Sequence, residues 1–361
     1  TFGSSDFGYS NPGRTISISL EGSTDNFSSS VVDLGGGTGD FTDTTTDQAA
    51  KVITPTSTTA YRYHRAKQTT SAGSTHFGQI MFFEDNTGDA RGFTLGSGPS
   101  GYNDNTENFV AWQWLAGGGA GSSNEDGALN TTTTTVNTTA GISISTYTGG
   151  GSATTIGHGL GVAPQFIIQK KRANDIASWH VYHEKIATSD PADWYITLDA
   201  SSIAYDDSIY WADTVPTSTV ISLGSSDDMV GSGDTFVIYS FVSVEGFSNF
   251  SNYTGNGNAD GSYIYTGFKP AWVMIKRTTT TNGDWIIYDN TRSPYNEIDD
   301  QLVANDATAE TTGSEEVDFL SNGFKIRTAD GGVNASGSNY IYAAFAEYPF
   351  GGEDVTPSTT F

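Results

Sequence analysis

Three carboxylates in one predicted turn are the first candidates for chemistry. The segment SSDDMVGSGD (225–234) holds Asp227, Asp228 and Asp234, and carboxylate oxygens are ligands that Ca²⁺ prefers. Short runs of Ser, Asp and Gly also form turns without any ion. The segment therefore predicts a turn and leaves a calcium site open.

A second acidic segment has the look of a calcium loop. NGNADG (256–261) approaches the D-x-[DN]-x-[DN]-G pattern and contributes Asp260, but Asn256 stands at the first ligand position and Gly267 stands where a bidentate glutamate is needed. The tip of a hairpin explains the same residues. We expect no cofactor, with calcium as the one ion that these two segments leave open.

His158 raises the question of a catalytic or metal-binding histidine. It lies among glycines in TIGHGLGVAPQFIIQKKR (155–172), and imidazole serves both roles. A related segment later in the chain keeps a glycine and the proline but places Ile264, 106 positions on, opposite His158. We therefore expect His158 to belong to the start of a strand. The basic residues that end the two strands are expected to be solvated: Lys170, Lys171, Arg172, Lys276 and Arg277.

Aromatic side chains are the remaining candidates, because a flat ring can stack on the C–H face of a sugar. Four of them lie in a loop-rich stretch that has no counterpart in the related segment, and they are our candidate ligand-binding residues: Trp194, Tyr205, Tyr210 and Trp211. Four others recur in both segments and are expected in the core: Trp179, Tyr182, Trp285 and Tyr288.

No catalytic motif is recognisable, and we predict that the chain is not an enzyme. There is no P-loop, no G-x-S-x-G nucleophile elbow and no H-E-x-x-H. Glycoside hydrolysis requires only two carboxylates across a cleft. With 41 acidic residues in the chain, the sequence neither supports nor excludes that chemistry.

Two tandem repeats organise the C-terminal part of the chain. Matching residues near their beginnings lie 106 positions apart, as Tyr147 and Tyr253 do. Near their ends the separation is 104, as for Phe241 and Phe345. Each repeat has the size of a domain. Because almost no linker separates the repeats, the sequence predicts a stiff array.

Composition narrows the possible partners. The formal net charge of −25 weighs against a general affinity for nucleic acid or for anionic membranes. The absence of cysteine rules out disulfides and thiolate metal sites. No apolar run approaches the ~18 residues that a membrane span requires, so we expect no membrane insertion.

The local pattern predicts strands throughout. Short runs of β-branched and aromatic residues are bounded by Gly, Asn, Asp, Ser or Pro, and no helical periodicity is sustained. We predict an all-β fold of tandem antiparallel β-sandwich or jelly-roll domains. The expected segments are 1–88 (sandwich segment), 89–140 (aromatic hairpin plus Gly/Ser/Thr-rich linker), 141–246 (sandwich repeat 1), 247–350 (sandwich repeat 2) and 351–361 (C-terminal tail).

The first segment resembles a known type of sandwich. TAYRYHRAKQTTSAGSTHFGQIMFFE (59–84) is similar to the C-terminal strands of discoidin-like, galactose-binding-type domains, in which a Tyr-Arg-Tyr strand leads to a second strand with an Ile-x-Phe-Phe close. The resemblance covers one pair of strands. It implies a jelly-roll topology for residues 1–88 and no particular ligand.

A larger resemblance covers most of residues 92–350. It is to a repeated domain of the virion proteins of marine tailed bacteriophages. It rests on NFVAWQWLAGG (108–118), AGISISTYTGGGSATTIGHGLGVAPQFIIQKKR (140–172), WHVYH (179–183), YWADTVPTSTVISLGS (210–225), VEGFSNFSNYTGNGNADGSYIYTGFKPAWVMIKR (244–277) and NASGSNYIYAAFAEYPF (334–350).

This resemblance implies a structural protein of the virion surface, acting as a fibre, appendage or capsid-decoration component that contributes to host-surface or glycan attachment. The implied partners are other virion proteins, further copies of the chain in a homo-oligomer, and a host-surface glycan. No catalytic residues are implied. The alternative is a secreted or virion-borne carbohydrate-active enzyme or its carbohydrate-binding module.

Overall fold

The computed structural model describes residues 15–23, 32–40, 63–70, 109–114, 116–117, 121–172, 177–279 and 283–347. The chain divides into two compact units, Thr1–Ala111 and Trp112–Phe361. Each unit is considered by itself below. All of the sheets are antiparallel, which confirms the predicted all-β fold.

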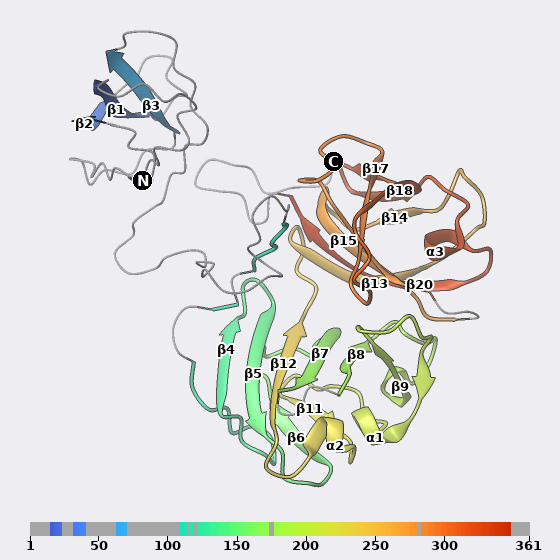
Figure 1. The fold of residues 1–361 in the computed structure, drawn as a ribbon. Coiled ribbons are helices and arrows are strands. Elements are labelled where there is room, and N and C mark those ends of the chain that lie inside the picture. Colours follow the sequence, from blue (N-terminus) through green and yellow to red (C-terminus); the bar gives the residue numbers. More distant parts are fainter. Residues whose placement is uncertain are drawn as a thin grey trace. The chain divides into compact units, whose positions relative to one another are not determined.

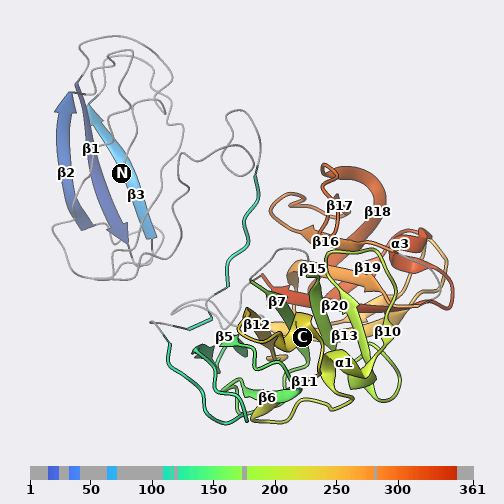
Figure 2. The ribbon, with the colours of Figure 1, turned by 60° about the horizontal axis from the view of Figure 1, so that its bottom comes forward.

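The first unit contains a three-stranded sheet. Its central strand is β1 (Thr15–Ser23), flanked by β2 (Val32–Asp40) and β3 (Tyr63–Thr70). Figure 2 shows the three strands side by side. Strand β3 includes part of the discoidin-like segment. The strand expected to follow it, over 76–84, lies outside the described residues.

Repeat 1 is built on a seven-stranded sheet with the spatial order β10-β9-β8-β7-β12-β5-β4. In Figure 1 its green and yellow strands form one layer, with the paired strands β6 and β11 and the helices α1 and α2 beside it. The bounds are β4 (Thr133–Asn137), β5 (Ile142–Thr148), β6 (Thr154–Gly157), β7 (Phe166–Lys171), β8 (Trp179–His183), η2 (Pro191–Asp193), β9 (Trp194–Thr197), β10 (Tyr205–Asp206), α1 (Ser208–Trp211), β11 (Val220–Leu223), α2 (Asp227–Val230) and β12 (Thr235–Phe241).

Repeat 2 forms an eight-stranded sheet with the order β13-β20-β15-β16-β17-β18-β19-β14. Its strands are orange to red in Figure 1. The bounds are β13 (Ser248–Thr254), β14 (Tyr263–Tyr265), β15 (Pro270–Arg277), β16 (Trp285–Asp289), β17 (Ile298–Val303), β18 (Thr311–Leu320), β19 (Gly323–Ile326), α3 (Gly331–Asn334) and β20 (Asn339–Ala346).

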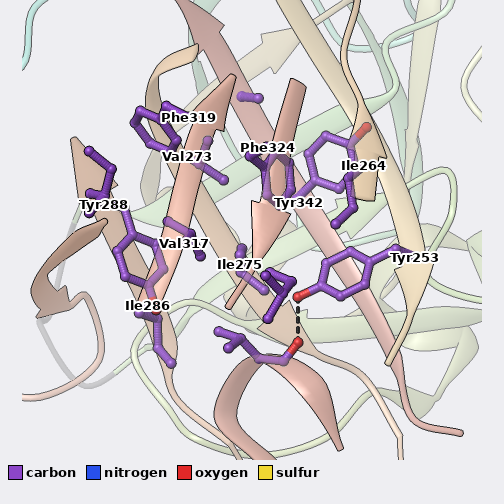
Figure 3. Packing of buried hydrophobic residues seen from close by; sticks show 14 of the residues in the cluster. Tyr253, Ile264, Val273, Ile275, Ile286, Tyr288, Val317, Phe319, Phe324 and Tyr342 are labelled. Atoms are coloured by element: carbon purple, nitrogen blue, oxygen red, sulfur yellow. Dashed lines mark hydrogen bonds between the residues drawn. The ribbon is translucent and has the colours of Figure 1, made fainter. Parts of the chain in front are cut away.

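The two repeats share their strand pairing and several side-chain contacts. The order β5-β12-β7-β8 of repeat 1 returns as β13-β20-β15-β16 in repeat 2. The Tyr147 hydroxyl donates to the carbonyl of Met229 at 2.8 Å, and the Tyr253 hydroxyl donates to that of Val333 at 2.7 Å. Figure 3 draws the second of these bonds. The repetition seen in the sequence is therefore a repetition of structure.

Each repeat has an apolar core of its own on one face of its main sheet. In repeat 1 this core joins the sheet to β6, β11, α1 and α2. In repeat 2 it joins β13, β15, β16 and β20 to β14, β17, β18, β19 and α3, and Figure 3 shows its side chains closing on one another. Strands that are apolar at consecutive positions, such as β16 with all five residues buried, need a second core on the opposite face.

That second core is shared by the two repeats. Phe166 of repeat 1 stacks on Phe250 of repeat 2, with ring centroids 5.5 Å apart. Trp285 is 1% exposed, and its indole N–H donates to the carbonyl of Thr197 in repeat 1 at 2.8 Å. The shared core draws on β5, β7, β8 and β9 from one repeat and on β13, β15, β16 and β20 from the other. The predicted stiffness thus has a physical basis, since an apolar interface resists hinge motion.

The basic residues at the strand ends are not all solvated, which corrects our expectation. Lys170 and Lys276 lie 5.7 Å and 5.8 Å from the ring centroids of Trp179 and Trp285. The ammonium groups donate to the backbone carbonyls of Ala177 and Gly283, respectively. Lys276 is completely buried, and burial lowers its pKa to about 8. At each strand end the aliphatic part of the lysine side chain packs against protein, and its ammonium makes a cation–π contact with the tryptophan ring.

Two further basic residues also have partners within the protein. Lys171 pairs with Asp234 at 2.7 Å, and the Arg277 guanidinium donates to the carbonyl of Gly331 at 2.9 Å. Arg172 is exposed, as expected.

The fold also corrects the residue aligned with His158. Ile156 and Ile264 are the equivalent buried residues of β6 and β14, so Ile264 matches Ile156 and His158 matches Thr266. Both carbonyls accept a side-chain bond from the neighbouring sheet, His158 from Ser143 and Thr266 from Asn249. His158 itself is buried, and its Nδ1 accepts from the Leu160 N–H at 3.2 Å. His158 therefore lies directly after the end of β6 and not, as we had expected, at the start of a strand. Its burial and its bonds to the backbone are those of a structural residue.

Candidate binding surface

Strand β9 and its neighbours gather aromatic rings on one face of repeat 1. Tyr195 of β9 and Tyr205 of β10 are directly paired across the two strands. Successive residues of a strand point to opposite faces, so Trp194 points away from these rings and packs against the shared core. Tyr210 reaches the same group from α1.

Four side chains form the group, which we call the tyrosine platform: His180, Tyr195, Tyr205 and Tyr210. The Tyr195 and Tyr210 rings are stacked with centroids 3.9 Å apart, and His180 stacks on Tyr210 at 4.5 Å. Tyr205 tilts against Tyr195 at 6.0 Å and is 48% exposed. The platform is therefore a set of mutually supported rings with one open member.

Two members of the platform, Tyr210 and His180, are uncharged near neutral pH. Burial raises the pKa of the Tyr210 hydroxyl, and its hydrogen bond with Tyr195 adds to the increase. Burial lowers the pKa of His180 to about 4. The rings consequently offer apolar faces together with neutral hydroxyl groups.

Carboxylates lie near the platform, since the charges of Asp228 and Asp207 raise the pKa of Tyr210 further. A second acidic group lies in the turns that flank β9 and β10, where Asp206 is paired with Trp194 and therefore points away from the platform rings. Desolvation raises the pKa of Asp193, and the negative charges of its neighbours raise it further: Asp213, Asp190 and Asp206. Carboxylate oxygens accept hydrogen bonds from hydroxyl groups. An aromatic face beside several acceptors is suited to a polyhydroxylated ligand.

The loops around the platform hold a strained backbone. Among the described residues, the non-glycine residues with positive φ are Asp190, Ala212 and Asp213, at 49°, 54° and 47°. Such conformations cost free energy and occur where surrounding structure enforces them. The Asp207 carboxylate also accepts from the Ile209 N–H at 3.1 Å and caps α1. The platform is thus held in one shape.

Two of the four aromatic candidates, Trp211 and Trp194, do not belong to the exposed surface. Trp211 is 1% exposed and makes an edge contact with Tyr182 in the core of repeat 1, and Trp194 faces the shared core. Sequence reasoning missed Tyr195 and His180. The alternation of sides along β9 shows that Trp194 and Tyr195 point to opposite faces but not which of them is exposed, and nothing local indicated His180.

The candidate calcium residues are not brought together as a ligand shell. Among the described residues, no three His, Cys, Asp or Glu side chains group closely enough to hold a metal ion. Asp227 and Asp228 begin α2, whereas Asp234 pairs with Lys171. The negative charges of all three aspartates raise the pKa of Lys171. Asp260 pairs with Lys325 at 2.6 Å. At each of the two segments that left a calcium site open, one carboxylate is thus paired with a lysine.

Fold and surface together define an all-β protein of two fused β-sandwich repeats that exposes an aromatic platform. A family model described as a domain of unknown function (DUF7483) matches residues 43–349. The match covers most of the chain, so the chain belongs to this family. Because it includes both repeats, it agrees with the core that they share.

No curated protein and no solved structure matches the chain significantly. In the described part of the chain, no helix has both the length and the apolarity needed to cross a membrane.

Proposed function

We propose that this protein is a structural component of a bacteriophage virion surface that attaches to host-surface glycans through the tyrosine platform. The virion assignment is supported by the sequence blocks of residues 92–350 that resemble phage domains. The glycan assignment is supported by the platform, which combines an exposed ring, that of Tyr205, with the nearby carboxylates of Asp207 and Asp228. The chain acts without catalysis, as a rigid binding element.

The observation that carries the proposal is the preorganisation of the platform. Tyr195, Tyr210 and His180 are stacked on one another, and the adjoining turns have a fixed backbone. A ligand that meets such a surface loses little free energy to ordering the protein. Single contacts of this kind are weak, and many copies on one particle raise avidity by roughly 10²–10⁴.

The binding test compares platform variants with a matched exposed tyrosine. The purified chain, multimerised on beads, is incubated with host cells and with a panel of bacterial surface glycans. Tyr205→Ala and Tyr210→Ala should each reduce bound beads about tenfold, equivalent to ~1.4 kcal/mol. Tyr295→Ala is the control, because Tyr295 is 83% exposed in repeat 2. Equal binding by all three variants would contradict a role for the platform.

The virion part of the proposal has a separate test. Particles whose DNA encodes this chain are purified and their proteins identified by mass spectrometry. The chain should be present in many copies per particle. Its absence from clean particles would exclude a structural role.

One observation favours a carbohydrate-active enzyme as the second candidate. A carboxyl group with a raised pKa, Asp193, stands near the carboxylate of Asp206 beside an aromatic surface, and glycosidases use such a pair as acid and nucleophile or base. On that alternative, the purified chain would release reducing ends from host polysaccharide, and Asp193→Asn would abolish the release. Our proposal predicts no release by either protein.

A further inference from the structure

In each repeat, three residues lie side by side across the main sheet, in the same register. Row 1, on strands β8, β7 and β12, consists of His183, Phe166 and Phe241. Row 2, on strands β16, β15 and β20, consists of Asp289, Trp272 and Phe345. Corresponding members of the two rows stand 106, 106 and 104 positions apart in the sequence. The rows are therefore the same part of the repeated fold.

Row 1 forms part of the contact between the repeats. Phe166 stacks on an aromatic ring of β13, and the centroid of the Phe241 ring lies 6.3 Å from that of Phe345. His183 Nε2 lies 3.3 Å from the carbonyl oxygen of Tyr342. Every member of row 1 thus contacts repeat 2, and two of these contacts are with its last strand, β20.

Row 2 contacts two tryptophans that precede repeat 1 in the chain. The Trp272 ring makes edge contacts with Trp112 and Trp114, with centroids 6.2 Å and 5.5 Å apart. The Phe345 ring lies 5.1 Å from that of Trp114. The Asp289 carboxylate accepts a hydrogen bond from the Trp112 indole N–H at 3.3 Å. Every member of row 2 therefore contacts one of the two tryptophans.

The two tryptophans stand in a further copy of the last-strand sequence. GFTLGSGPSGYNDNTENFVAWQWL (92–115) aligns without a gap with GFKIRTADGGVNASGSNYIYAAFA (323–346), at a separation of 231. The alignment places Trp114 opposite Phe345. Phe241 contacts Phe345 in the first interface, and Phe345 contacts Trp114 in the second. Equivalent residues thus meet twice, so the interface is repeated as well as the fold.

The chemistry of row 2 suits a tryptophan. Where row 1 has His183, whose N–H faces a backbone carbonyl, row 2 has Asp289, whose carboxylate is an acceptor. Asp289 is 2% exposed, and Arg292 balances its charge at 2.6 Å. Trp112 adds a neutral indole N–H on a large apolar ring, whereas Ala343, the aligned residue of β20, has no side-chain donor. Row 2 therefore favours an aromatic donor at this place.

The two tryptophans reach row 2 from within the same chain. Both lie outside the strands, so their side chains rather than a β ladder hold them. Shortly after Trp114 the chain already lies against repeat 1, because a Cβ on Gly117 would be 2.6 Å from Thr135 Cγ2 and 3.0 Å from the Val136 carbonyl oxygen. The chain thus passes directly from row 2 to strand β4, and the occupant of row 2 is identified.

We propose that row 2 is a docking site for a Trp-x-Trp segment, and that this chain fills the site in cis with Trp112 and Trp114. The segment takes the part that β20 takes on row 1, with one indole N–H on Asp289 and both rings against the aromatic members of row 2. The chain is thereby fastened to repeat 2 at residue 112 by side-chain recognition. Buried aromatic anchors of this kind dominate binding free energies. This inference does not depend on the tyrosine platform.

The binding test supplies the segment in trans. The full chain with both Trp112→Ala and Trp114→Ala has a vacant row 2, and circular dichroism and the Tm establish that it is folded. A dye-labelled peptide of residues 108–117, NFVAWQWLAG, is titrated with this variant and followed by fluorescence anisotropy. Saturable one-to-one binding is expected. The unaltered chain should bind the peptide at least tenfold more weakly, because its site is already filled.

Variants of the peptide test the recognition without changing the protein. Trp112→Phe in the peptide keeps an apolar ring but removes the N–H that Asp289 accepts, and should weaken binding about tenfold. A peptide with both Trp112→Ala and Trp114→Ala should not bind. Phe109→Ala is the matched control, because Phe109 is 50% exposed in the chain, and this peptide should bind like the native one.

A second test cuts the chain. A protease site is inserted between Gly117 and Gly121, and the cleaved protein is passed through a gel-filtration column. The two fragments should elute together, and they should separate when the chain also carries Trp112→Ala and Trp114→Ala.

The inference is overturned if the native peptide does not bind, if the peptide without tryptophans binds equally well, or if the cut fragments of the double variant stay together. It is also overturned if light scattering shows a dimer that the two substitutions convert to a monomer, since a second copy would then fill the site.

Discussion

At the scale of residues, one buried histidine, His183, joins the two repeats. His183 is 1% exposed, and its Nδ1 accepts from the Lys185 N–H at 3.1 Å. Nε2 therefore carries the proton and donates to the Tyr342 carbonyl of repeat 2 at 3.3 Å. Burial lowers the pKa of His183 to about 4. The neutral imidazole is thus part of the contact between the repeats.

We predict that acidification removes stability that depends on His183. In the unfolded chain the imidazole binds a proton near pH 6.5, whereas the folded chain resists it until about pH 4. Stability from this group is present above pH 6.5 and falls as the pH drops through that window, by up to ~1.4 kcal/mol per pH unit. Urea unfolding at several pH values should give His183→Gln a flatter profile than the unaltered chain. Parallel profiles would contradict the assignment.

At the scale of elements, each repeat packs a glycine against the turn that follows its short helix. A Cβ on Gly149 would lie 2.3 Å from the Gly231 carbonyl oxygen, and one on Gly255 would lie 2.4 Å from that of Ala335. Neither contact involves a flexible side chain. The close approach explains why both repeats have glycine directly after the strands β5 and β13.

We predict that Gly149→Ala and Gly255→Ala each lower the free energy of unfolding by about 1–3 kcal/mol, because the backbone must shift to admit a methyl group. Gly150→Ala is the matched control: nothing lies within 4 Å of its added Cβ, and its stability should remain within about 0.5 kcal/mol. Chemical denaturation measures all three. If Gly255→Ala left the free energy of unfolding unchanged, α3 would not pack as described.

At the scale of the whole second unit, the shared core makes the two repeats one folding unit. Phe250 is 2% exposed and contacts Phe166 and Phe241 of repeat 1 as well as Phe345 of its own repeat. Removing either repeat would expose this face of the other. The tandem arrangement is therefore a fusion of two sandwiches through their sheets.

We predict a single cooperative transition for residues 121–347 in calorimetry. Phe250→Ala should cost about 3–5 kcal/mol. Val317→Ala is a sharper probe, because Val317 belongs to the core of repeat 2 alone. Hydrogen exchange should show that it reduces protection in repeat 1 as well. Loss of protection confined to repeat 2 would mean that the repeats unfold independently.

The sequence by itself determined the strands, the repetition and the all-β class, because these follow from local composition and from spacing along the chain. It also indicated three buried aromatic residues, Tyr182, Trp285 and Tyr288, since residues kept in both repeats tend to be core. The same expectation was wrong for Trp179, which is only partly buried and belongs to none of the three apolar cores. The alignment of the repeats was two residues off at His158, because the turns before and after β6 and β14 differ in length while the strand pairing is the same.

Only the tertiary structure decided which face of each strand meets which core. Strands buried on both faces lose the alternation that would reveal their sides, so Trp194 could not be told from Tyr195 as the residue of the platform. Lys276 was expected to be a solvated charge, but its ammonium lies over the Trp285 ring and donates to the Gly283 carbonyl. The shared core depends on contacts between residues far apart in the chain, and no local pattern encodes those.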